Sequence, residues 1–162
     1  MFHGKKKAVT FSFDDGVTQD IRAIEILNKY GLKATFNLNS ALLGLGGYLD
    51  RNGKRVSHSK VHAGDVKAVY AGHEIACHTL THPNLVELDE KTIVWQVEED
   101  RKILSDISGQ EVVGMAYPCG GVNNDDRVAE IIGRETGVKY SRTTSSDHGF
   151  SRQSNLLRFN PT

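Results

Sequence analysis

The chain has 162 residues, enough for one domain with a substantial hydrophobic core and too few for two. Its 20 lysines and arginines balance its 20 aspartates and glutamates, so net charge does not point to nucleic acid or an anionic membrane as a partner. No stretch approaches the roughly 20 apolar residues of a membrane helix, and the first residues lack the apolar core of a signal peptide, so we expect a cytoplasmic location.

Strand-like and helix-like segments alternate from the amino terminus. Residues 7–13 are rich in β-formers and predict a first strand. Apolar side chains at helical spacing then predict a helix that ends at Gly31, and residues 33–38 predict a second strand. Residues 40–59 contain several glycines and are too long for a simple connection, so we interpret them as a functional, lid-like excursion.

The alternation continues toward the carboxyl terminus. The further predicted elements are a short helix over 62–71, a strand over 74–77, a helix capped by Asp89 and ending at Gly109, a strand over 112–117, a helix before Gly137, a strand over 138–143 and a last β-like run over 156–159.

This order of elements predicts an α/β fold. Strands that alternate with helices form a parallel sheet with right-handed crossovers, either as an open doubly wound sheet or as a barrel. In both cases functional residues gather at the carboxyl ends of the strands. No internal repeat and no linker stand out, so we expect a single domain over residues 1–162.

Two adjacent carboxylates stand at the end of the first predicted strand, where packing alone does not favour charge. Side chains of neighbouring strand residues point to opposite faces, so Asp14 and Asp15 diverge unless the chain turns. Gly16 supplies the backbone freedom for such a turn. The arrangement suggests a separate role for each acid.

Two histidines follow the third predicted strand. His78 and His82 are four residues apart, a spacing that places both on one side of a helical turn. Two imidazoles and one carboxylate form a three-ligand set for a divalent metal and leave a position for water. The water becomes a nucleophile when its pKa falls to about 7, and the second carboxylate can act as a general base. This is the equipment of a hydrolase.

Three short motifs carry a family resemblance: Ser12–Gly16, Gly72–Pro83 and Met115–Gly120. They resemble, in the same order, the first motif, the second motif and a variant of the third motif of the polysaccharide deacetylase, or NodB-homology, family of metal-dependent carbohydrate esterases. The resemblance spans residues 8 to about 143, which is nearly the whole chain.

The resemblance implies a fold and a set of roles. It implies a distorted (β/α) barrel, with Asp15, His78 and His82 as metal ligands and Asp14 as the catalytic base. The implied metal is Zn²⁺, with Co²⁺ or another divalent ion in some members. The implied reaction removes an N-acetyl or O-acetyl group from a sugar, and the backbone amide of Cys119 would help to hold the oxyanion.

Two departures from the family pattern matter. Met115 and Ala116 stand where the family usually has an arginine that pairs with the base, and our hypothesis is that Arg142 replaces it. The family's carboxyl-terminal histidine acid has no counterpart, so we interpret the barrel as incomplete at its carboxyl end, since a full eight-unit barrel takes about 250 residues. His148 is the best internal substitute for that acid.

Other polar residues can be interpreted from their position in the sequence alone. Asn37 and Asn39, at the end of the second strand, and Tyr117 are candidate substrate-binding residues. His58 and His62 are also four residues apart, but no acid flanks them, so we interpret them as solvated loop residues.

The sequence therefore predicts a metal-dependent hydrolase that deacylates an acylated sugar or oligosaccharide. A hydrolase of a small non-carbohydrate amide is an alternative, because the acyl chemistry does not require a sugar. A non-catalytic carbohydrate-binding protein is a third possibility, motivated by the missing arginine and acid. It is weakened by the presence of Asp14, which metal binding does not need.

Overall fold

A computed structural model describes Gly4 and residues 8–162. Five parallel strands form one sheet whose spatial order follows the chain, β1-β2-β5-β6-β7. The strands are β1 (Phe11–Asp14), β2 (Ala34–Leu38), β5 (Glu74–Cys77), β6 (Gly114–Ala116) and β7 (Tyr140–Arg142). A parallel sheet that adds each strand beside the previous one is the way a (β/α) barrel is built, and this chain forms half of such a barrel.

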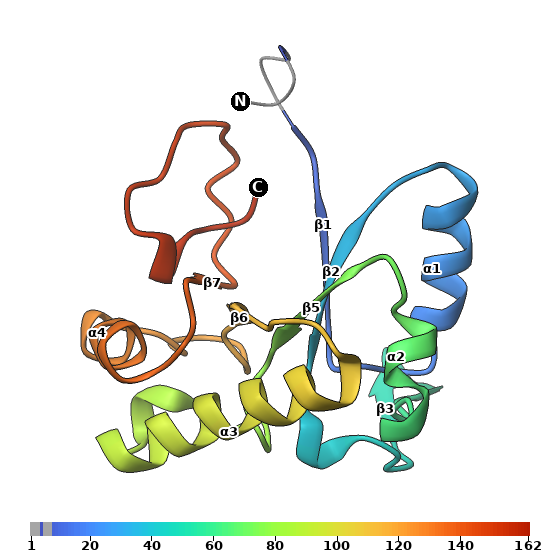
Figure 1. Ribbon diagram of the computed structural model, residues 1–162, viewed down its shortest axis with the longest axis horizontal. Helices are drawn as coiled ribbons and strands as arrows, with labels where there is room; N and C mark the ends of the chain where they lie inside the picture. The colour runs from blue at the N-terminus through green and yellow to red at the C-terminus, as the bar shows by residue number, and fades with distance from the viewer. Residues whose placement is uncertain (1–3, 5–7) are drawn as a thin grey trace.

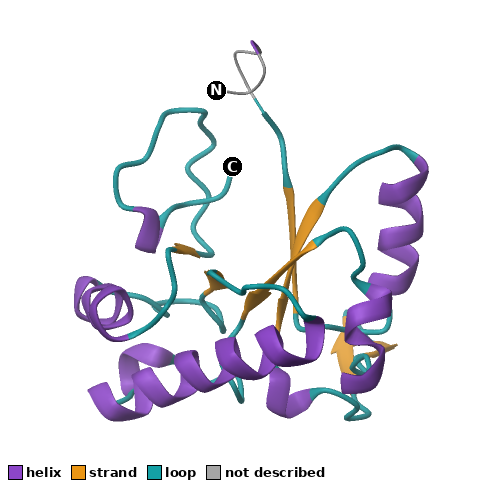
Figure 2. Ribbon diagram, in the orientation of Figure 1, coloured by secondary structure: helices purple, strands orange, loops and turns teal. Residues whose placement is uncertain are grey.

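Within the part of the chain that the structure describes, four α-helices connect or flank these strands (Figures 1 and 2): α1 (Asp20–Lys29), α2 (Val66–Val69), α3 (Glu90–Ser108) and α4 (Asp126–Glu135). In Figure 1, α1 and α2 lie on one side of the strands, α3 runs beneath them, and α4 lies on the other side. Each of these helices buries apolar side chains in the core, including Ile24, Leu27, Val66, Ile93, Val97, Leu104, Val128 and Ile132.

Local signals explain where the longest helix begins and ends. Asp89 Oδ1 accepts a hydrogen bond from the Thr92 backbone N–H at 3.1 Å, so the predicted cap of α3 is confirmed. The helix closes at Gly109, whose φ of 71° lies in the left-handed region that favours glycine.

Among the predicted strands, the one over 74–77 keeps its limits and the others differ: β2 begins at Ala34, and β7 covers Tyr140–Arg142 instead of 138–143. The first covers Phe11–Asp14, with residue 7 outside the described residues, and the fourth covers only Gly114–Ala116. The run predicted over 156–159 is instead a 3₁₀ turn, Leu156–Arg158, because the Asn155 side chain accepts from the Leu157 backbone N–H and caps a turn. After it, only Phe159 pairs with β7, through a single parallel bridge to Arg142.

The excursion over 40–59 is mostly ordered structure. After a 3₁₀ turn (Ser40–Leu42), β3 (Tyr48–Arg51) and β4 (Lys54–Ser57) form an antiparallel hairpin. Asn52 and Gly53 join the two strands, with φ values of 54° and 73°. Positive φ at both residues is what a two-residue type I′ hairpin turn requires. The hairpin returns the chain to the carboxyl end of β1.

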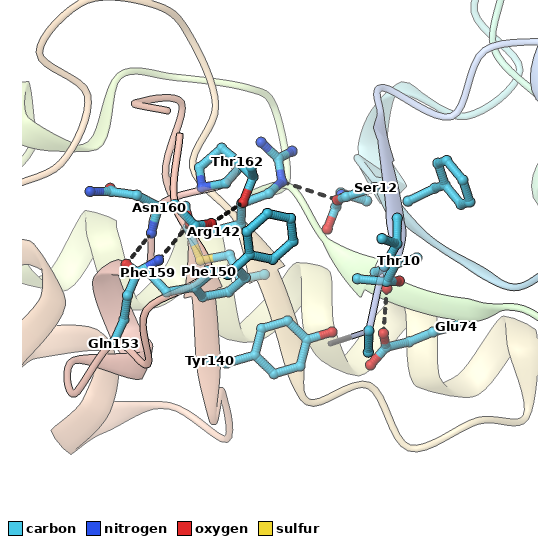
Figure 3. A pocket seen from close by; sticks show the side chains of 18 of the residues that line it. Thr10, Ser12, Glu74, Tyr140, Arg142, Phe150, Gln153, Phe159, Asn160 and Thr162 are labelled. Carbon is cyan, nitrogen blue, oxygen red and sulfur yellow. Dashed lines mark hydrogen bonds between the residues drawn. The ribbon is translucent and has the colours of Figure 1, made fainter. Parts of the chain in front are cut away.

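A cavity of about 840 Å³ lies on the inner face of the half-barrel, between β1 and the segment 149–162 (Figure 3). Ser12 and Arg142 line it, and none of the three predicted metal ligands does. Within the described residues, no helix has both the length and the apolar character needed to cross a membrane.

Candidate metal centre

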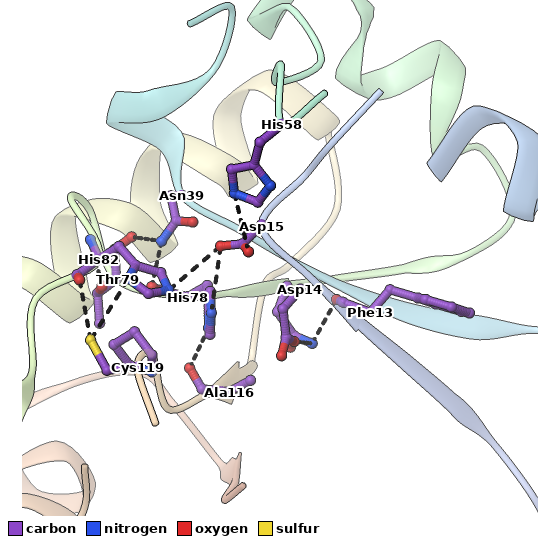
Figure 4. Close-up of polar contacts among 12 residues, drawn as sticks. Phe13, Asp14, Asp15, Asn39, His58, His78, Thr79, His82, Ala116 and Cys119 are labelled. Carbon is purple, nitrogen blue, oxygen red and sulfur yellow. Dashed lines mark hydrogen bonds and ion pairs between the residues drawn. The ribbon is translucent and has the colours of Figure 1, made fainter. Parts of the chain in front are cut away.

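The acid pair lies at a sharp change of backbone direction. Asp14 is the last residue of β1, and Asp15, directly after it, has a φ of 80°. The Asp15 backbone N–H donates to the carbonyl of Asn37 at 2.9 Å, which ties the turn to β2. The two carboxylates therefore face different partners, as the sequence predicts (Figure 4).

The structure brings the three predicted ligands together. Asp15 Oδ1 lies 3.5 Å from His82 Nε2 and 4.0 Å from His78 Nε2. The three ligand atoms all lie within 4.8 Å of one another. Ligands about 2.0–2.1 Å from a tetrahedral Zn²⁺ lie roughly 3.4 Å apart, so this donor set fits a divalent metal after a small contraction.

The histidine loop is not helical, so that part of the prediction is wrong. Thr79 and His82 have φ values of 68° and 64°, which break a helical turn. The loop is held instead by Gln96 of α3, whose Oε1 accepts from the Thr81 backbone N–H at 3.0 Å and whose Nε2 donates to Thr81 Oγ1 at 2.8 Å. Long-range hydrogen bonds, and not helical spacing, set the distance between the two histidines.

The orientation of His78 is fixed by its second nitrogen. His78 Nδ1 donates to the carbonyl of Ala116 at 2.8 Å, because a carbonyl can only accept, and Nε2 is left to face Asp15. The side chain is buried, and burial lowers the pKa of His78. The neutral ring is the form that binds a metal.

The buried carboxylate of Asp100 holds the backbone at the start of the histidine loop. Asp100 accepts from the backbone N–H of His78 at 3.0 Å and from that of Ser40 at 2.6 Å. Burial raises the pKa of Asp100 to about 7, although both hydrogen bonds act in the opposite direction. Asp100 thus joins α3 to the ends of β2 and β5. This role was not evident from the sequence, because an acid on a helix resembles an ordinary surface residue.

Asp14 is held by residues from two other strands. Asn37 Nδ2 donates to Asp14 Oδ1 at 2.8 Å, and Arg142 Nη2 forms an ion pair with the same oxygen. Arg142 also donates through Nε to Ser12 Oγ at 3.0 Å. The structure thus places Arg142, on the last strand, where the hypothesis of a replacement arginine requires it.

Of the three predicted substrate-binding residues, Asn37 lines the cavity of Figure 3, whereas Asn39 and Tyr117 do not. Asn37, Asn39 and Tyr117 are at most 1% exposed. Asn39 Nδ2 donates to the carbonyls of His78 and Thr79, and the Tyr117 hydroxyl donates to the carbonyl of Leu157. These hydrogen bonds give Asn39 and Tyr117 a supporting role, and substrate contact by Asn37 stays a prediction.

Cys119 lies at the edge of the cluster in a left-handed turn, with a φ of 68°. Its Sγ is 3.8 Å from His82 Nδ1 and 3.5 Å from the His82 carbonyl oxygen. Burial raises the pKa of the Cys119 thiol. Its backbone N–H donates to no group within the described residues, which leaves this amide free for the predicted oxyanion contact.

His148 does not join this cluster. Its side chain is exposed, and no hydrogen bond or ion pair within residues 8–162 connects it to the acid pair or to the two histidines. The prediction that it supplies the acid therefore has no support from its position.

His58 of the excursion and Lys60, which closely follows it, both reach the cluster, so the interpretation of His58 as a solvated loop residue is not supported. His58 Nε2 lies 3.5 Å from Asp15 Oδ2, and Lys60 Nζ lies 3.6 Å from Asp15 Oδ1. Figure 4 shows His58 across the Asp15 carboxylate from His78. Burial lowers the pKa of His58 and that of Lys60, and Asp15 opposes both shifts. The turn residues Asn52 and Gly53 were the one sequence signal for the hairpin that brings them here.

Comparison with known proteins decides the family. The family model described as polysaccharide deacetylase matches residues 3–140, which is most of the chain. The chain belongs to the polysaccharide deacetylase family. The matched range contains the acid pair, the histidine pair and Cys119, so the resemblance seen in the three motifs is confirmed.

Individual members of the family are distant. The chain is 26% identical over 130 residues to the peptidoglycan-N-acetylglucosamine deacetylase PgdA of Listeria monocytogenes, covering 78% of this chain and 24% of PgdA. The fold matches the deacetylase PplD of Streptococcus pyogenes with a TM-score of 0.75 and 23% identity, over 98% of this chain and 65% of PplD. The prediction of an incomplete barrel of the polysaccharide deacetylase type is thus confirmed.

A third similar protein is described as a pseudoenzyme. BA3943 of Bacillus anthracis, described as a CE4 family pseudoenzyme, is 25% identical with a TM-score of 0.61, over 82% of this chain and 43% of that one. The present chain spans less than half the length of the curated relatives it matches.

Proposed function

We propose that this chain carries the metal-binding and water-activating part of a hydrolase that removes an acetyl group from an N- or O-acetylated sugar. The observation that carries the proposal is the division of the acid pair: Asp15 faces two histidines, while Asp14 is held apart by Arg142. Membership in the polysaccharide deacetylase family supports it. Because PgdA is named for N-acetylglucosamine of peptidoglycan, an N-acetylated amino sugar is the favoured substrate class.

Asp15, His78 and His82 would hold the metal. Their two nitrogens and one oxygen suit Zn²⁺ best, and Co²⁺ or another divalent ion can use the same donors. When bound there, the ion supplies Lewis acidity and a water acidic enough to react near neutral pH.

The remaining residues of the site handle the proton and the developing charge. The Asp14 carboxylate lies outside the ligand set and accepts the proton of the attacking water. Arg142 and Asn37 orient that carboxylate by donating to Oδ1. The Cys119 backbone N–H is placed to donate to the acyl oxygen as negative charge develops on it.

Acetate release tests the proposal. The full chain, supplied with Zn²⁺, is expected to release acetate from N-acetylglucosamine oligomers or from acetylated xylan. Asp14→Asn should keep its metal and lose about 10²-fold or more in turnover, as expected when a general base is removed. Asp15→Ala and His78→Ala should lose the metal, measured by elemental analysis. Full turnover of Asp14→Asn, or full metal content in both ligand variants, contradicts the proposal.

A non-catalytic carbohydrate-binding role is the second candidate. The likeness to BA3943, described as a pseudoenzyme, and the exposed position of His148 favour it. Metal uptake and sugar binding without acetate release from any acetylated sugar would establish this role. Acetate release from small amides alone would instead identify a hydrolase of non-carbohydrate amides.

A further inference from the structure

The hairpin fixes one short segment beside the acid pair. The Thr18 backbone N–H donates to the carbonyl of Ser59 at 2.8 Å, and the Val61 N–H donates to that of Gly16 at 2.9 Å. Between these bonds, Lys60 forms a bridge with the turn after β1, and its own N–H donates to the carbonyl of Leu45 at 2.9 Å. The backbone at Lys60 is therefore held on both sides, which sets the direction of its side chain.

The Lys60 ammonium is buried against the predicted metal ligands. Lys60 is 8% exposed, and its Nζ lies 3.6 Å from Asp15 Oδ1. This is the same oxygen that His82 approaches to 3.5 Å and His78 to 4.0 Å. A metal bound by these three residues and the Lys60 ammonium would both need Asp15 Oδ1.

We propose that Lys60 is an internal counter-cation of the metal centre, which competes with the divalent metal for Asp15 Oδ1 and weakens metal binding. The inference rests on the proposed function, since it takes Asp15, His78 and His82 as the ligands. It assigns to the segment that follows the β3–β4 hairpin the role of setting the affinity of the centre for its metal.

Charge and geometry support this competition. Two cations about 4 Å apart in a partly buried site repel strongly, because protein surroundings screen charge less than water does. Lysine has only donors, so His58 Nε2, 3.1 Å from Lys60 Nζ, must accept from it. His58 and Asp15 together hold the ammonium in place, and the backbone hydrogen bonds around Lys60 fix the direction in which its side chain leaves the backbone.

A supporting role for Lys60 predicts the opposite result. Metal-binding carboxylates are often oriented by a hydrogen-bond donor outside the ligand set, and removal of that donor typically weakens metal binding about 10- to 100-fold. The sign of the change in metal affinity therefore separates a competing cation from an orienting donor.

The test measures Zn²⁺ dissociation constants by competition with a chromophoric chelator. Lys60→Met keeps the length of the apolar stem and removes the charge, and it should bind Zn²⁺ at least about tenfold more tightly than the native chain. Lys60→Arg keeps the charge and should stay near the native value. Lys54→Met removes an exposed charge from the same hairpin and should have no effect.

Thermal unfolding gives a second readout. Because a ligand stabilises the folded state more when it binds more tightly, a fixed Zn²⁺ concentration should raise the Tm of Lys60→Met more than that of the native chain. Equal or weaker Zn²⁺ binding by Lys60→Met overturns the inference, and Lys60→Gln gives the same comparison if the methionine variant does not fold. A native chain that binds no metal overturns the proposed function as well, whereas equal affinities with acetate release overturn only the inference.

Discussion

At the scale of single residues, one backbone angle separates two chemical roles. Asp14 ends β1 in the strand, and Asp15 turns away with a φ of 80°. A left-handed conformation costs a non-glycine residue about 1–3 kcal/mol, and the hydrogen bond from its N–H to Asn37 offsets part of that cost. The strain lies at the position where two adjacent carboxylates must serve different partners.

Arg142 should matter for turnover through the position of Asp14. Its guanidinium donates to Asp14 Oδ1, so Arg142→Ala removes a charged hydrogen-bond partner of the proposed base. The variant should have a kcat/KM about tenfold lower than that of the native chain. Arg134→Ala, which breaks only exposed ion pairs within α4 and to Glu90 of α3, is the matched control. An unchanged kcat/KM for Arg142→Ala contradicts its pairing role.

At the scale of elements, α3 sets the position of the histidine loop. Its Gln96 side chain bonds Thr81 twice, and its backbone carbonyl accepts from the Leu80 N–H at 2.9 Å. One turn further along the helix, Asp100 holds the backbone of His78. The two predicted ligands from this loop are therefore positioned by a helix that contributes no ligand itself.

Replacement of Gln96 should loosen the loop and weaken the metal centre. Gln96→Met leaves the Thr81 N–H and hydroxyl without partners, so we expect Zn²⁺ affinity to fall by about tenfold or more. The free energy of unfolding should also fall by about 1–3 kcal/mol. Chelator competition and urea unfolding measure the two effects. Glu99→Met, which removes only an exposed ion pair on α3, should change neither. A stability loss without an affinity loss would show that Gln96 does not position the ligands.

At the scale of the whole molecule, the sequence predicted those features that depend on residues close together in the chain. The strand end at Asp14 and the capped helix after Asp89 were found because their signals lie within a few residues. The position of Lys60 was not derivable in this way, and that of Arg142 was proposed only because the family pattern requires an arginine beside the base. Lys60 reaches Asp15 only through the hairpin and its pairing with the turn after β1, and Arg142 reaches Asp14 only because the sheet curves until its last strand faces its first.

Burial of acids also shapes stability across the molecule. Asp20, at the start of α1, is 4% exposed and accepts from the Tyr70 hydroxyl at 2.8 Å. Burial raises the pKa of Asp20 to about 6, although the Tyr70 hydrogen bond acts in the opposite direction. The folded state therefore retains a proton on Asp20 between about pH 4 and pH 6 that the unfolded chain releases. The stability this proton gives is complete below pH 4 and is lost as the pH rises through 6.

Asp20→Asn should remove this pH dependence. The asparagine oxygen can still accept from Tyr70 and never becomes charged, so the variant should gain up to about 3 kcal/mol in unfolding free energy at pH 7.5 relative to the native chain. At pH 4 the two proteins should be nearly equally stable, because Asp20 is protonated there in the folded state. Urea unfolding at both pH values, with a chelator present, measures the difference. Asp106→Asn, at an exposed position on α3, should give no pH-dependent change. A constant difference between native and Asp20→Asn at both pH values would show that the buried charge of Asp20 is not the cause.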